Sequence, residues 1–177
     1  MSNSYDNDVM LDLETTGISA GCCVLSIGAC TLDRKFSIYL GISHESCLDY
    51  ALRDAQSTMD WWDKQPAAAY GEAFSGTLSL PEALTKFNAW LSSVKPQRIW
   101  GNGAAFDLPI LGTAYEAAAM TPAWPRFSDR CYRTMKDIYS GVPKPPFVGV
   151  KHNALADARF QAEHLYTILE IHDYAKS

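Results

Sequence analysis

Two acidic residues stand one position apart near the start of the chain. Asp12 and Glu14 follow the apolar residues 9–11 and precede a Thr-Thr-Gly turn at residues 15–17. In a strand, alternate side chains face the same side, so both carboxylates point together and the intervening leucine points away. Paired carboxylates repel each other unless a cation lies between them, and a hard divalent cation such as Mg²⁺ prefers carboxylate oxygens. The pair therefore predicts a metal site, or else a strand end whose acids are hydrated.

Three later residues could join this pair. Asp107 follows a Gly-Asn-Gly turn, and His152 precedes Asp157 by five positions at the start of an apolar-striped segment. Each of these residues could instead have a purely structural role. Asp107 could cap a helix, Asp157 could be an acid in a first turn that the helix dipole stabilises, and His152 could lie at the surface. Residues five apart lie about 140° apart around a helix. With Asn153 as the N-cap, His152 would instead lie in the preceding loop and fold back over a site that Asp157 enters, as metal-assisted hydrolysis requires.

Further residues are weaker candidates for substrate contacts. Trp61 and Trp62 are adjacent, so they cannot share one face of a helix, and one ring should be partly exposed. Such a ring either packs at the edge of the core or offers a platform on which a base can stack. Arg133 could approach a phosphate or could be a solvated charge at a helix start.

The order of elements predicts a mixed α/β sheet covered by helices. Strands are expected from residue 9, over 22–32 and over 36–40 as a meander, with a fourth over 98–100. Helices are expected in pieces over 47–72, after a Ser79–Glu82 capping box, from 104 to about 119, around 133–139, and from 153 to about 174. Residues 121–129 are expected to be a loop.

Bulk properties narrow the function classes. The chain has 177 residues with 47% hydrophobic residues and a net charge of −5, which predicts one domain over residues 1–177. No segment reads as a signal peptide or as a membrane span. The acidity disfavours broad binding of duplex DNA, so a polynucleotide substrate should be held by a few nucleotides at one end. The five cysteines lack CxxC spacing, which disfavours disulfides or a zinc site and favours a reducing cytoplasm.

Three stretches, in order, resemble the motifs of the DEDDh (DnaQ-like) 3′–5′ exonucleases. The first is Asp12-Leu13-Glu14-Thr15, the second runs from Asn102 to Asp107, and the third runs from His152 to Asp157 with the HxxxxD spacing of the histidine subgroup. The likeness spans residues 9 to about 170. Together with the tryptophan pair, it is greatest to the small single-domain branch of Rv2179c-like exoribonucleases and related phage exonucleases.

The resemblance implies a ribonuclease H-like fold, with a five-stranded mixed sheet and helices on both faces. It implies a hydrolase that releases nucleoside 5′-monophosphates from the 3′ end of single-stranded or frayed nucleic acid, with RNA slightly favoured over DNA. Two Mg²⁺ or Mn²⁺ ions would be held, one by Asp12, Glu14 and Asp157, the other by Asp12 and, through water, Asp107. His152 would be the general base. Small members of the family are commonly homodimers.

The resemblance also implies substrate contacts. Thr15 would meet the terminal nucleotide, Phe106 would pack against its base or sugar, and one of Trp61 and Trp62 would stack on the next base. Arg133 would approach a phosphate.

Two alternatives stay open at this point. Asp12-Leu13-Glu14-Thr15 also resembles the DxDxT start of haloacid-dehalogenase-type phosphatases, although the second acid is Glu and no later Asp-Asp pair suits their metal site. The chain could instead be a catalytically inactive nucleic-acid-binding module on the same fold, but that reading would be favoured by the loss of one of the five catalytic residues, and all five are present.

Overall fold

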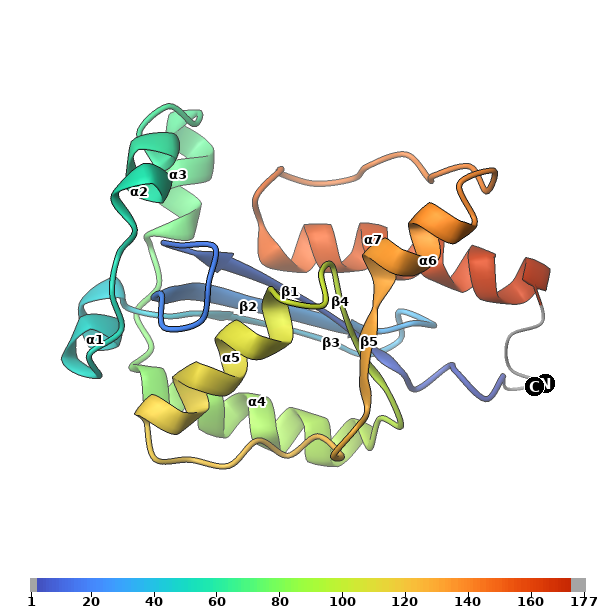
Figure 1. The fold of residues 1–177 in the computed structure, drawn as a ribbon, viewed down its shortest axis with the longest axis horizontal. Helices are drawn as coiled ribbons and strands as arrows, with labels where there is room; N and C mark the ends of the chain where they lie inside the picture. The colour runs from blue at the N-terminus through green and yellow to red at the C-terminus, as the bar shows by residue number, and fades with distance from the viewer. Residues whose placement is uncertain (1–2, 173–177) are drawn as a thin grey trace.

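The expected meander forms the first half of the sheet in the computed structural model, which describes residues 3–172 (Figure 1). Strands β1 (Val9–Thr15), β2 (Val24–Thr31) and β3 (Ser37–Gly41) pair antiparallel in succession. In this register Asp12 lies opposite Gly28, a pairing that matters for the site below.

The second half of the sheet runs parallel to β1. Strand β4 (Ile99–Gly101) pairs with β1, and β5 (Asp129–Cys131) pairs with β4, giving the order β3-β2-β1-β4-β5. The prediction of a loop over 121–129 was wrong at its end, because Asp129 begins β5. This strand has only three residues, two of them charged, so it lacks apolar alternation and is defined by its backbone pairing alone.

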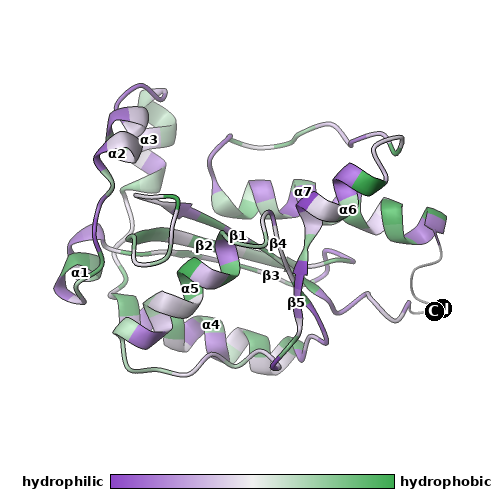
Figure 2. Cartoon of the chain, viewed as in Figure 1, coloured by the Kyte–Doolittle hydropathy of each residue, from purple (hydrophilic) through white to green (hydrophobic). Residues whose placement is uncertain are grey.

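Helices cover both faces and one end of the sheet (Figure 1). The helices on both faces carry hydrophobic and hydrophilic residues side by side, as helices that pack one side on a sheet do (Figure 2). One face holds α4 (Leu80–Val94) and α5 (Asp107–Ala117), the other holds α6 (Tyr132–Ile138) and α7 (Ala154–His172), and the end holds α1 (His44–Asp49), α2 (Gln56–Trp62) and α3 (Ala67–Ala73). The capping box of α4 is confirmed, because the Ser79 amide donates to Glu82 Oε2 at 3.0 Å. The expected helix end at Tyr174 lies outside the described residues.

Alternation along β1 divides the core into two layers. Leu11 and Leu13 belong to the cluster that α4 and α5 share with the sheet. Met10 belongs to the cluster on the other face, with Ala158 and Leu165 of α7. Asp12 and Glu14 therefore share the face that α7 covers, as the sequence predicted. Among the described helices, none combines the length and the apolar character needed to cross a bilayer.

Candidate active site

Three carboxylates from two elements meet where β1 ends. Asp12 and Glu14 come from β1, and Asp157 comes from the first turns of α7. One oxygen of each lies within 4.8 Å of the others, a spacing at which a single cation can contact all three. They line a cavity of about 490 Å³.

Asp107 lies behind this group as the first residue of α5. Its side chain is fully buried, and its Oδ2 accepts a hydrogen bond from the Asn102 amide at 2.7 Å. Its Oδ1 is buried without a hydrogen-bond partner in the described chain. A buried carboxylate oxygen without a donor is costly, and a water bound to a cation would satisfy it.

Gly28 allows α7 to bring Asp157 so close to β1. A Cβ built on Gly28 would lie 2.1 Å from the carbonyl carbon of Ala154 and 2.2 Å from the Leu155 nitrogen. The start of α7 thus rests directly on the backbone of β2, opposite Asp12. Gly28 could not be recognised as a site residue from the sequence, because a glycine inside a strand indicates only that some backbone comes close.

We expect Gly28→Ala to impair both stability and catalysis. The added methyl group meets backbone atoms that cannot rotate away, so about 1–3 kcal/mol of stability should be lost, and a displacement of Asp157 by about 1 Å can cost on the order of 100-fold in rate. Gly112→Ala in α5 is the matched control, because a Cβ there meets nothing within 4 Å. The melting temperature and the turnover rate of Gly28→Ala and Gly112→Ala are compared. Equal values for the two variants would contradict this role of Gly28.

His152 lies in the loop before α7, and Asn153 caps the helix as predicted. The Asn153 Oδ1 accepts from the Ala156 amide at 2.9 Å, and the helix begins at Ala154. The backbone of His152 is left-handed at φ 63°, and its amide donates to Asp157 Oδ2 at 3.0 Å. The backbone of this short segment is thus tied directly to Asp157.

Aromatic rings hold the His152 imidazole at the cavity. Its ring centre lies 4.9 Å from that of Trp61 and 6.1 Å from that of Trp62, edge to face in both cases. Trp61 is 40% exposed, whereas Trp62 is 1% exposed and its indole donates to the Thr15 carbonyl at 2.9 Å. The expectation that only one of the adjacent rings is exposed is confirmed.

Gln161 is a further site residue that the sequence did not reveal. It lies one helical turn after Asp157 on α7, and its Nε2 donates to Asp12 Oδ1 at 2.7 Å. The other amide atom, Oε1, is buried without a partner among the described residues. A glutamine within an apolar helix stripe carries no sequence signal of this contact.

We expect Gln161→Leu to lower kcat/KM by about 10- to 100-fold, as the loss of partners that orient metal-ligating carboxylates generally does. Asp12 would keep its charge but lose the hydrogen bond that fixes its rotamer. Gln97→Leu, at an exposed position before β4, serves as the control. Similar kinetics for both variants would show that Gln161 does not orient Asp12.

Burial and mutual repulsion shape the charges of the site. Burial, followed by the charges of Asp107 and Glu14, raises the pKa of Asp12 well above its ordinary value. Burial, with repulsion from Asp157 and Asp107, raises the pKa of Glu14 to about 8. Burial also raises the pKa of Asp107 to about 6, against the hydrogen bond from Asn102 that lowers it. Carboxylates held this way fit a divalent cation, whose charge would reverse these shifts.

These shifts predict that the cation-free protein loses stability as pH rises. An acid whose pKa is raised in the folded state keeps its proton there after the unfolded chain has lost its own, so the free energy of unfolding falls with pH. For Glu14 this window runs from its ordinary 4.5 to about 8. Thermal unfolding in EDTA from pH 5 to 8.5 measures the slope, which should be shallower in Glu14→Gln. Mn²⁺ should raise the melting temperature more at pH 8 than at pH 6; the opposite trend would contradict the charge arrangement.

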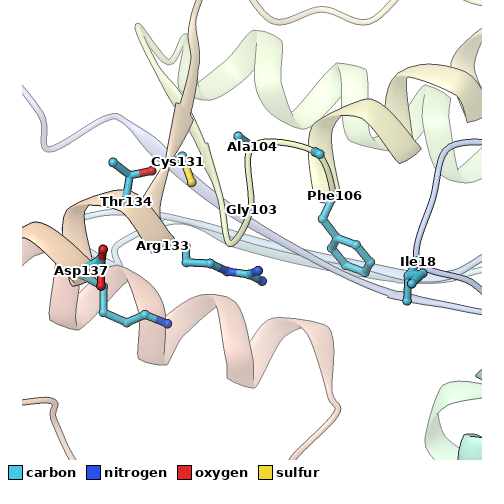
Figure 3. A pocket seen from close by; sticks show the side chains of 10 residues that line it. Ile18, Gly103, Ala104, Phe106, Cys131, Arg133, Thr134 and Asp137 are labelled. Carbon is cyan, nitrogen blue, oxygen red and sulfur yellow. The ribbon is translucent and has the colours of Figure 1, made fainter.

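Of the residues predicted to contact substrate, four line the cavity of the three carboxylates. Thr15, Trp61, Trp62 and Phe106 do so, and the Thr15 hydroxyl donates to the Gly17 carbonyl at 2.6 Å. Arg133 instead lines a neighbouring cavity of about 920 Å³, and its Nη2 donates to the Asn102 carbonyl at 2.7 Å. Phe106 lines both cavities, and Figure 3 shows it facing the same opening as Arg133.

Two comparisons with known proteins gave a match. Residues 7–169 match the family model described as the 3′-5′ exoribonuclease Rv2179c-like domain. A solved structure described as the nuclease domain of 3′hExo, a DEDDh family member, bound to rAMP, is similar at a TM-score of 0.64 and 11% sequence identity, covering 96% of this chain and 95% of that one. The likeness confirms the expected fold, a five-stranded mixed sheet with helices on both faces. A search of curated proteins gives no match.

Proposed function

Because the chain belongs to the Rv2179c-like family of 3′-5′ exoribonuclease domains, we propose that it removes nucleotides one at a time from the 3′ end of single-stranded or frayed RNA. As a hydrolytic exonuclease it is not a phosphatase of the haloacid-dehalogenase type. The observation that carries the proposal is the meeting of Asp12, Glu14 and Asp157 within 4.8 Å, with Asp107 buried behind them.

The carboxylates fit two divalent cations, Mg²⁺ or Mn²⁺. Asp12, Glu14 and Asp157 would hold one, and Asp12 and Asp107 would hold the other, with a water satisfying the unpartnered Asp107 Oδ1. When bound, such ions lower the pKa of a water and neutralise charge on the phosphate and the leaving oxygen. Gln161 keeps Asp12 in position, and His152 accepts the proton of the attacking water.

The cavity walls support contacts with the last two nucleotides. Trp61 exposes its ring beside His152 and can stack a base, which is worth about 1–3 kcal/mol. The buried Trp62 positions both Trp61 and the Thr15 backbone. The nucleic-acid chain would continue past Phe106 into the cavity of Arg133 (Figure 3). Lys136 also lines that cavity and adds positive charge for a phosphate.

The preference for RNA rests on the family description and on the ribonucleotide in the similar nuclease domain. Matched RNA and DNA oligonucleotides, labelled at either end, test direction and polymer with Mg²⁺ or Mn²⁺. A 5′ label should give a ladder that shortens by single nucleotides, a 3′ label should leave at once as a 5′-monophosphate, and EDTA should stop both. Faster loss of DNA would overturn the RNA preference, and intact RNA and DNA would overturn the proposed activity. Light scattering on the same sample tests the expected homodimer.

A further inference from the structure

A second cluster of metal-ligand side chains lies outside the catalytic carboxylates. Cys23 immediately precedes β2, His44 is the first residue of α1, and Asp54 lies in the loop before α2. One ligand atom from each, a sulfur, an imidazole nitrogen and a carboxylate oxygen, lies within 4.8 Å of the other two.

The contacts inside this cluster bring together buried and accessible groups. His44 Nε2 and Asp54 Oδ1 are 2.8 Å apart, with side chains 25% and 29% exposed. Cys23 is fully buried, so the cluster opens to solvent on the side of His44 and Asp54. An ion could therefore enter from that side and reach the thiol.

A second buried thiol lies on α1, outside this group of three. Cys47 lies one turn after His44 on α1 and is fully buried. Its own Sγ donates to the Val24 carbonyl at 3.3 Å. The group itself thus offers one sulfur, one nitrogen and one oxygen, three donors of the kinds that Zn²⁺ sites use, and leaves the fourth position to a water.

We propose that Cys23, His44 and Asp54 bind one Zn²⁺ ion, with a water as the fourth ligand. Thiolate and imidazole ligands select a softer ion than Mg²⁺, which prefers oxygen alone. The all-carboxylate group of Asp12, Glu14 and Asp157 and this cluster therefore differ in the ions that they favour. The cysteine pattern pointed away from zinc because the donors come from three separate segments, so no CxxC spacing marks them.

The ion would anchor the segment that leads into α2, whose tryptophans line the cavity of the three carboxylates. Helix α2 begins two residues after Asp54 and carries Trp61 and Trp62. The Ala55 amide donates to the Thr16 carbonyl at 2.9 Å, next to the end of β1. A zinc ion at this point would join the segments before β2, at the start of α1 and before α2.

Cobalt substitution tests the site through a signal that carboxylates cannot give. Co²⁺ bound to thiolate shows a sulfur-to-metal charge-transfer absorption in the near ultraviolet, whereas oxygen ligands alone do not. We expect the full chain to develop this absorption with one equivalent of Co²⁺ and to lose it when Zn²⁺ is added. The readout needs no nuclease activity, so its outcome is independent of the proposed function.

Variants locate the signal. The absorption should be lost in Cys23→Ser and in His44→Ala but kept in Cys30→Ser, a buried cysteine of β2 outside the cluster, and in Asp12→Asn. Asp54→Ala, at a partly exposed position, should weaken Co²⁺ binding and replaces Cys23→Ser if that variant does not fold. No charge-transfer absorption in the wild type, or one that survives in both Cys23→Ser and His44→Ala, would overturn the proposal.

Discussion

Replacing Asp12 by asparagine is expected to lower the rate of 3′-terminal cleavage by at least about a thousandfold. Metal ions supply several kcal/mol of transition-state stabilisation, and each 1.4 kcal/mol is about tenfold in rate. Asp12 is the residue proposed to hold both ions, and it faces Glu14 and Asp157 directly. Its loss therefore removes more of the proposed chemistry than the loss of any other single carboxylate.

The variant should nevertheless fold. Asparagine keeps an Oδ1 that can accept from Gln161, and it removes a buried charge that burial and neighbouring acids disfavour. Its melting temperature in EDTA at pH 8 should match or exceed that of the wild type, and Mn²⁺ should no longer raise it. Asp129→Asn, an exposed acid in β5, should change neither quantity. An Asp12→Asn protein that cleaves within tenfold of the wild type would rule out Asp12 as a metal ligand.

The placement of the candidate catalytic residues could be predicted from the sequence because it follows from local backbone geometry. A strand fixes the shared direction of Asp12 and Glu14, and their face proved to be the one that α7 covers. The capping residue Asn153 likewise predicted that His152 lies before the helix and Asp157 within it. In each case a local rule of backbone geometry was enough.

Features that depend on contacts between distant segments could not be predicted in this way. Gly28 matters only because the start of α7 rests on it, and Gln161 only because Asp12 lies opposite. Strand β5 exists through pairing with β4 rather than through its own residues. The cluster of Cys23, His44 and Asp54 could not be predicted either, because its members come from separate segments and meet only in the folded chain.

The second large effect is expected at His152, and the structure suggests which substitution to use. Its backbone is left-handed, a conformation that asparagine tolerates better than most residues, and its amide holds Asp157. The Asn153 side-chain amide also donates a hydrogen bond to Glu72 of α3, which holds the loop independently of the imidazole. His152→Asn should therefore keep the loop and Asp157 in place while removing the proton acceptor.

We expect His152→Asn to lower kcat by about 100- to 10,000-fold, the range typical of a lost general base, while the Mn²⁺-dependent rise in melting temperature stays at the wild-type value. This separation distinguishes a base from a metal ligand, because Asp12→Asn should lose both. Trp61→Phe is the matched control for the ring contacts, since it keeps an aromatic edge against the imidazole; it should change KM more than kcat. An unchanged kcat in His152→Asn would remove the histidine as the base, and a lost response to Mn²⁺ would show that it acts through the carboxylates instead.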